Sequence, residues 1–124
     1  MKILSIEHVQ LAIPAGAEDA ARTFYINILG FIEIPKPPQL SQRGGLWLRS
    51  GNVQLHLGVD HEFHPARKAH PAFLVMDLES ALEKVQVAGY EWDLSQPRLD
   101  GFNRAHIYDP FGNRIELMEK LQDR

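Results

Sequence analysis

Two pairs of polar residues stand at the same separation in the two halves of this 124-residue chain. His8 precedes Gln54 by 46 residues, and His70 precedes Glu116 by the same interval. Imidazole nitrogens combined with carboxylate and amide oxygens suit Mn, Fe, Co, Ni or Zn. Because the chain has no cysteine, thiolate zinc sites, disulfides and a cysteine nucleophile are excluded. Four such ligands would leave two positions of an octahedron open for water or for two neighbouring substrate oxygens.

A competing interpretation applies to each of these residues taken singly. A histidine, glutamine or glutamate on a strand is more often solvated or hydrogen-bonded than bound to a metal. The matching separations carry weight only if the two halves of the chain fold alike. The elements that hold the four residues therefore decide between the two interpretations.

The first half begins with an apolar and polar alternation over residues 6–13 that predicts a strand containing His8. Helical spacing of apolar residues predicts a helix over 17–29, and Gly30 suits the left-handed position that ends a helix. Pro35, Pro37 and Pro38 then mark a loop. Strands are predicted over 31–34, 46–49 and 53–59, with a hairpin turn at 50–52.

The second half repeats this order of elements. A strand over 72–76 precedes a helix over 78–88, with Asp77 as its N-cap, and strands follow over 90–94, 105–108 and 114–119. Gly51-Asn52 corresponds to Gly112-Asn113 in this alignment. The repeat predicts an α+β fold with two tandem βαβββ units in a single domain, 1–124. Unit 1 covers about 3–59, the linker about 60–69 and unit 2 about 70–120.

Several segments resemble the vicinal oxygen chelate superfamily, which includes glyoxalase I, bleomycin-resistance proteins, fosfomycin-resistance proteins, methylmalonyl-CoA epimerase and extradiol dioxygenases. The resemblance covers nearly the whole chain, and its most specific part is Asp109-Pro110-Phe111-Gly112-Asn113-Arg114-Ile115-Glu116-Leu117. Shorter matches are Ile6-Glu7-His8-Val9, Leu29-Gly30-Phe31 and Gly51-Asn52-Val53-Gln54-Leu55. The resemblance implies curved mixed sheets that form a cleft.

The resemblance also implies a metal site and an assembly. Family ligands come from the first and last strands of each unit, which here places them at His8, Gln54, His70 and Glu116. The cofactor would be a divalent Ni, Zn, Mn, Co or Fe ion. Single-chain members of this length are usually homodimers in which each subunit completes a site of its partner.

The reaction implied is a glyoxalase-like isomerase or lyase proton transfer on a small oxygen-chelating substrate, with the metal stabilising an enolate. Glu116 would serve as both ligand and proton shuttle. Gln54 cannot act as a base, and the stretch 43–47 lacks the carboxylate that the epimerase carries on its third strand. The alternatives are an extradiol-type dioxygenase or a thiol transferase that uses the His-His-Glu face, although fosfomycin-resistance enzymes usually have Thr where Gln10 stands. A metal-free, bleomycin-resistance-like binding protein is a further alternative.

Other residues are candidates for acid–base catalysis or for the substrate pocket. His56 follows Gln54 by two residues, so it should share the same strand face and is a candidate catalytic acid or base. It is equally consistent with a hydrogen-bonded core histidine. His106 and Tyr108 are further acid–base candidates. Candidates for lining the pocket are Trp47, Phe63, Phe102, Arg104, His106 and Tyr108.

Composition and charge limit the kinds of partner that the protein is expected to bind. A net charge of −3 and a pI near 6.0 give no electrostatic reason to expect nucleic acid. No apolar run approaches the roughly 20 residues that a membrane span needs. Glu7 stands where a signal peptide would need its apolar stretch. We therefore expect a cytoplasmic protein with a small-molecule substrate.

Overall fold

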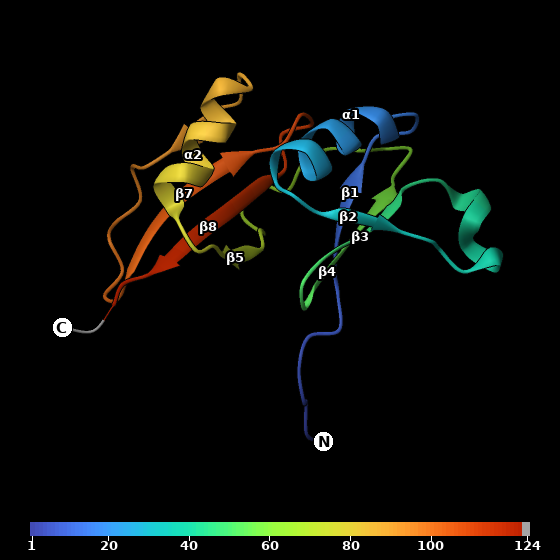
Figure 1. The fold of residues 1–124 in the computed structure, drawn as a ribbon. Helices are drawn as coiled ribbons and strands as arrows, with labels where there is room; N and C mark the ends of the chain where they lie inside the picture. The colour runs from blue at the N-terminus through green and yellow to red at the C-terminus, as the bar shows by residue number, and fades with distance from the viewer. Residues whose placement is uncertain (123–124) are drawn as a thin grey trace. The chain divides into compact units, whose positions relative to one another are not determined.

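Each half of the chain forms its own four-stranded mixed sheet with helical segments packed beside it (Figure 1). The computed structural model describes residues 1–122. Contacts divide the chain into unit 1, Met1–His64, and unit 2, Pro65–Arg124. The predicted α+β fold with two tandem βαβββ units is confirmed.

Unit 1 has the strand order β1-β4-β3-β2. Strand β1 pairs in parallel with β4, whereas β3 pairs antiparallel with both of its neighbours. The first and last strands of the unit are therefore adjacent, which brings residues far apart in sequence next to each other. Its elements are β1 (Val9–Ile13), α1 (Glu18–Arg22), η1 (Thr23–Ile28), β2 (Ile32–Ile34), η2 (Pro38–Arg43), β3 (Leu46–Ser50) and β4 (Val53–Val59).

Unit 2 repeats this arrangement with the strand order β5-β8-β7-β6. Strand β5 is parallel to β8, and the remaining pairs are antiparallel. Asp77 caps α2 as predicted, because its carboxylate accepts a hydrogen bond from the Ser80 amide at 3.1 Å. The elements are β5 (Ala72–Leu74), α2 (Leu78–Val87), β6 (Trp92–Asp93), β7 (Phe102–Tyr108) and β8 (Arg114–Lys120).

Strand alternation separates an apolar core from a polar face in each unit. In unit 1 the core holds Leu55 and Leu57, while Gln54 and His56 lie on the opposite face of β4. In unit 2 the core side chains of β7 and β8 are Ala105, Ile107, Ile115 and Leu117. Because residues of opposite parity point the other way, the polar face of unit 2 carries Arg104, His106, Arg114 and Glu116.

Several predicted boundaries differ from the structure. In unit 2, β5 ends at Leu74, β6 covers only Trp92–Asp93 and β7 begins at Phe102. The helix predicted over 17–29 is α-helical only over Glu18–Arg22 and continues as the π-helix η1, where the Leu29 amide donates to the Phe24 carbonyl. Strand β1 begins at Val9, so His8 lies just before it rather than within it. The proline-marked loop contains the short 3-10 helix η2. Gly30 has the expected left-handed backbone, with φ of 82°.

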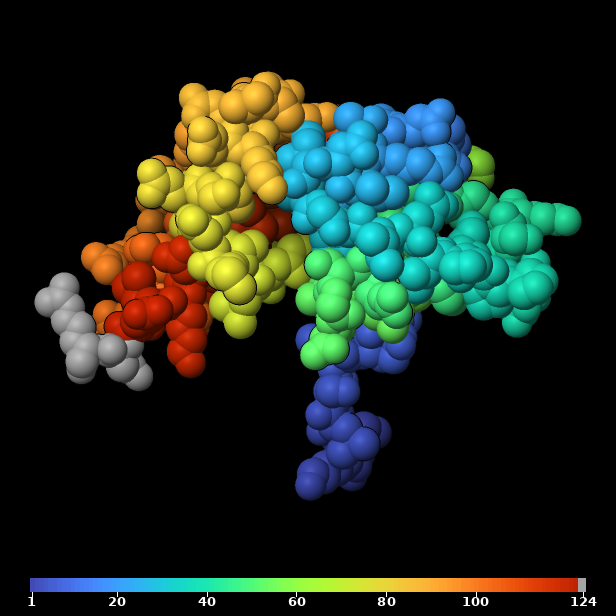
Figure 2. All heavy atoms as spheres, in the orientation of Figure 1, coloured from blue at the N-terminus to red at the C-terminus, as the bar shows by residue number. Residues whose placement is uncertain are grey.

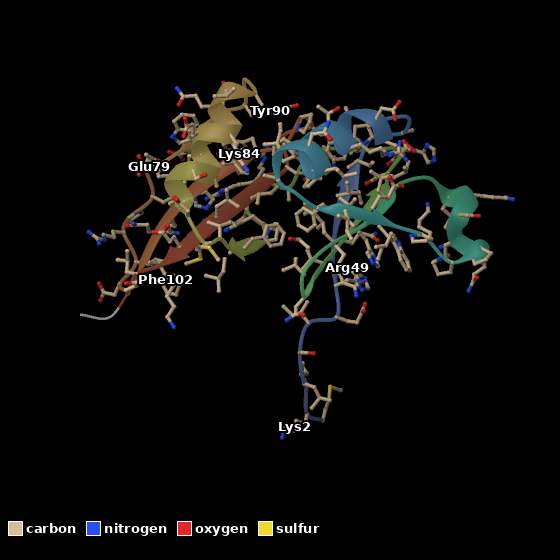
Figure 3. The ribbon with its side chains drawn as sticks, viewed as in Figure 1. Lys2, Arg49, Glu79, Lys84, Tyr90 and Phe102 are labelled. Atoms are coloured by element: carbon tan, nitrogen blue, oxygen red, sulfur yellow. The ribbon has the colours of Figure 1, made fainter. Side chains whose placement is uncertain are left out.

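The start of the chain, where Lys2 lies, extends away from the unit 1 sheet (Figures 2 and 3). Ile3, Leu4 and Ile6 in this segment are each about four-fifths exposed. None of the helices within residues 1–122 is long and apolar enough to cross a bilayer.

Candidate metal centre

Three polar side chains of unit 2 converge on one point of its polar face. His106 on β7 lies directly opposite Glu116 on β8, and Ala72 on β5 lies opposite Glu116 on the other side. His70 precedes Ala72 by two residues, so the chain entering β5 delivers its imidazole to the same place. The ligand atoms of His70, His106 and Glu116 all lie within 4.8 Å of one another.

Glu116 is the centre of this cluster. Its Oε1 lies 3.0 Å from His70 Nε2 and 3.5 Å from His106 Nε2, and its Oε2 accepts a hydrogen bond from Arg104 Nη1 at 3.2 Å. The Glu116 side chain is only 7% exposed. Burial raises the pKa of the Glu116 carboxyl, but the contacts with His70 and Arg104 outweigh burial and leave this pKa below its ordinary value. The carboxylate is therefore ionised at neutral pH.

A hydrogen bond on the side of the His70 ring opposite Glu116 determines which of the two ring nitrogens carries the proton. His70 Nδ1 lies 2.9 Å from the Lys68 carbonyl oxygen, which can only accept, so Nδ1 carries the proton. In the neutral ring Nε2 is then unprotonated and faces an ionised oxygen, which is also an acceptor. A second proton or a metal cation between the two atoms makes this contact favourable. Metal-binding histidines commonly donate their other ring N–H to a backbone carbonyl in this way.

His106 is buried, with 1% of its surface exposed. Burial lowers its pKa, Arg114 lowers it further, and Glu116 opposes the shift only in part, so the ring is neutral at neutral pH. Arg114 Nη2 lies 3.1 Å from His106 Nε2. The sequence indicates His106 as an acid–base or pocket candidate and not as a ligand, although the pairing of β7 with β8 places it opposite Glu116. The sequence predicts no role for Arg114, which precedes Glu116 by two residues and shares its strand face.

The other two predicted ligands lie together in unit 1. Val9 pairs with Leu55, so His8 comes level with Gln54 at the parallel β1–β4 edge. Both line a cavity of about 590 Å³ together with Trp47 and His56. His8 Nδ1 contacts Glu7 Oε1 at 2.7 Å. Within each unit, therefore, the structure brings together the two residues that the sequence predicts as a pair of ligands.

His56 lies between two other rings on the polar face of unit 1. Its ring centroid is 4.1 Å from that of His8 and 4.1 Å from that of Trp47, with interplanar angles of 16° and 5°. Its Nε2 is buried and has no hydrogen-bond partner among residues 1–122. Burial lowers the pKa of His56, His8 lowers it further, and Glu7 raises it by a smaller amount. The face shared by Gln54 and His56 is confirmed, since both line the same cavity.

The remaining predicted pocket residues lie at several places. Phe102, at the beginning of β7 (Figure 3), lines a second cavity of about 780 Å³ beside α2, together with Arg104. Arg104 donates Nε and Nη2 to the Pro97 carbonyl at 3.1 and 2.6 Å, in addition to its bond with Glu116. Tyr108 shares the face of His106 on β7, and Phe63 is half-buried in the segment that follows β4.

Comparison with known proteins defines the class. The sequence profile of the Glyoxalase/Bleomycin resistance protein/Dioxygenase superfamily matches residues 5–117. The chain therefore belongs to this superfamily. No curated protein sequence matches the chain.

Solved structures agree with this assignment. A glyoxalase family protein from Bacillus anthracis is 43% identical, with a TM-score of 0.90 over 97% of this chain and 98% of that one. A glyoxalase family protein from Enterococcus faecalis is 24% identical, with a TM-score of 0.73 over 93% and 97%. The fosfomycin resistance protein FosX from Listeria monocytogenes, as an E126Q mutant complexed with Mn(II) and 1S,2S-dihydroxypropylphosphonic acid, is 18% identical, with a TM-score of 0.80 over 96% and 94%.

Proposed function

We propose that the protein is a divalent-metal-dependent enzyme that acts on a small substrate with two neighbouring oxygens. The observation that carries this proposal is the convergence of His70, His106 and Glu116, whose ligand atoms all lie within 4.8 Å of one another. The nitrogen and oxygen donors of the cluster suit Mn, Fe, Co, Ni or Zn. The residues present therefore fit a metal ion.

His70 and Glu116 would hold this ion, and His8 and Gln54 of unit 1 are the further ligands that the repeat predicts. A bound ion would act as a Lewis acid that stabilises negative charge on a substrate oxygen. We propose an isomerase- or lyase-type proton transfer in which Glu116 accepts the proton. His56, neutral and buried on the wall of the unit 1 cavity, is the second acid–base group.

A homodimer in which each subunit completes a site of its partner is part of this proposal. Strands β1 and β5 each lie at the end of their own sheet, and apolar side chains of the N-terminal segment are exposed. Mixing two inactive variants, His8→Ala and Glu116→Gln, tests the arrangement. If the sites are shared, random exchange of subunits makes about half of the dimers mixed. One of the two sites in each mixed dimer is then intact, so activity returns to about a quarter of all sites. An inactive mixture that contains mixed dimers would contradict site sharing.

The metal is tested first. Protein purified without chelator should contain about one divalent ion per chain, measured by inductively coupled plasma mass spectrometry, and Glu116→Gln should lose it. Failure of Ni, Mn, Fe, Co and Zn to bind by calorimetry would contradict the enzyme proposal and favour a small-molecule binding protein. Glu119→Gln is the matched control, since Glu119 lies on the same strand but bonds the Leu78 amide instead.

The reaction is tested next with a substrate panel. Methylglyoxal with thiols, a catechol under oxygen, fosfomycin with thiols or water, and methylmalonyl-CoA separate the chemistries known in the superfamily. The phosphonic acid with two neighbouring hydroxyls in the FosX complex favours fosfomycin as the second candidate after the glyoxalase-type substrate. Oxygen consumption with a catechol would instead assign a dioxygenase.

A further inference from the structure

Arg114 and Glu116 both contact the same nitrogen of His106. Arg114 Nη2 lies 3.1 Å from His106 Nε2, and Glu116 Oε1 lies 3.5 Å from it. A guanidinium can only donate, so the hydrogen bond from Arg114 requires a lone pair on Nε2. The neutral ring therefore carries its proton on Nδ1, which is buried without a partner among residues 1–122.

This tautomer is the one that binds a metal through Nε2. The lone pair that Arg114 occupies lies beside the Glu116 oxygen and near His70 Nε2, whose lone pair faces the same oxygen. Three acceptor atoms thus meet in one place, and Arg114 is bonded to one of them. Neither the separation of 46 residues nor the resemblance assigns a ligand role to His106.

We propose that His106 completes a three-ligand metal site within unit 2, and that Arg114 competes with the metal for its Nε2. This inference rests on the proposed function only in requiring that a metal binds at His70 and Glu116. The separations of Glu116 Oε1 from the two histidine nitrogens fit, because ligands with metal bonds of roughly 2.0–2.2 Å lie about 3.0–3.5 Å apart in octahedral or tetrahedral geometry. The contacts of Glu116 Oε1 with the two histidines, at 3.0 and 3.5 Å, match this spacing.

Arg114 should weaken the binding of a metal at His106. Metal binding must break the Arg114–His106 hydrogen bond and leaves a guanidinium close to a dication, which opposes binding. Arg114 Nε is itself buried without a hydrogen-bond partner in the part of the chain that the structure describes. Replacing Arg114 with an apolar side chain of similar length therefore removes the competing donor. It leaves no former partner of Arg114 Nε unpaired, because this atom has none among residues 1–122.

The test compares Arg114→Met and His106→Asn with the wild type, by calorimetric titration with Mn(II) and Zn(II) after chelator treatment. Arg114→Met should tighten binding about three- to tenfold, the factor expected for removing one competing hydrogen bond. His106→Asn should weaken binding at least about tenfold. Lys120→Met is the matched control, because it removes a cation from an exposed position of the same strand and should leave the affinity unchanged.

A second variant, His106→Gln, and a spectroscopic measurement keep the inference testable if His106→Asn folds poorly. Pulsed electron paramagnetic resonance of the Mn(II)-loaded protein should detect one histidine nitrogen fewer in the His106 variant that folds, and the wild-type number in Arg114→Met. Metal binding that is unchanged in both variants, with an unchanged nitrogen signal, overturns the role of His106 while leaving the metal enzyme intact. Absence of metal binding in the wild type overturns both proposals.

Discussion

Arg104 joins the Glu116 carboxylate to the loop that follows β6. Its Nη1 donates to Glu116 Oε2 at 3.2 Å, while Nε and Nη2 both donate to the Pro97 carbonyl at 3.1 and 2.6 Å. Because Oε2 is bonded to Arg104, Oε1 is the oxygen directed at the histidines. The guanidinium thereby restricts the carboxylate to one donor atom for a metal.

We expect Arg104→Gln to weaken metal binding about tenfold, since groups that orient a metal ligand typically contribute a factor of this size. The pKa of Glu116 should rise at the same time, because a charged hydrogen-bond donor is lost. Calorimetric titration and carboxylate NMR measure the two effects. Arg98→Gln, in the same loop but exposed, is the control. Equal effects of both variants would show that general charge, rather than this contact, is responsible.

His56→Gln should lower turnover on the identified substrate about a hundredfold, the usual contribution of one acid–base group. Glutamine retains polar atoms but cannot exchange a proton near neutral pH. His64→Gln provides a matched loss of an exposed histidine and should leave turnover unchanged. The measurement is steady-state kinetics with metal occupancy checked in each variant. Full activity in His56→Gln would assign His56 a purely structural role in the ring stack.

Stability should decrease as the pH falls below about 6.5, the ordinary histidine value, because both His56 and His106 have lowered pKa values in the folded state. Between that value and the folded-state pKa, the unfolded chain binds protons that the folded chain does not, which favours unfolding. Thermal melts of metal-free protein at pH 7.5 and 5.5 measure the difference. His56→Gln should show a smaller difference than the wild type. A larger one would contradict this account.

Gly45→Ala should destabilise unit 1 by more than about 2 kcal/mol, since a left-handed backbone and a steric clash act together. Gly45 has φ of 79°, and an added Cβ would lie 2.0 Å from the Leu57 carbonyl oxygen. Gly89 has a similar φ of 87° but open space around it, so Gly89→Ala should cost only about 1 kcal/mol. Urea denaturation compares the two variants. Equal losses would mean that the backbone relaxes at β3.

Much of the fold follows from the sequence because its signals are local. The alternation of β4 gave its observed bounds, Val53–Val59, and Asp77 was identified as a cap from residue type and position. The π-helix η1 could not be predicted, because apolar spacing does not distinguish hydrogen bonds to the fourth and fifth preceding residues. His8 was placed inside a strand because alternation continues before Val9, although the backbone pairing does not.

The candidate site also has residues that the sequence predicts and residues that it does not. Equal spacing in a repeated unit was sufficient to pair His8 with Gln54 and His70 with Glu116. The contributions of Arg104, His106 and Arg114 depend on which residues of β7 and β8 face each other, and that register is a tertiary property. Their partners lie across the strands, so residue type alone could not reveal that both arginines are engaged.

Each unit places its first and last strands side by side, so each carries one pair of the proposed ligands at one edge of its sheet. The two pairs can consequently change independently. Unit 1 supplies an amide and unit 2 a carboxylate at the corresponding position of the last strand. One exchange, Gln54→Glu, would alter the charge around a metal without disturbing the strand pairing that positions it. In a duplicated scaffold of this kind, a single substitution in either copy would change the Lewis acidity of a bound metal ion. The range of substrates would change with it.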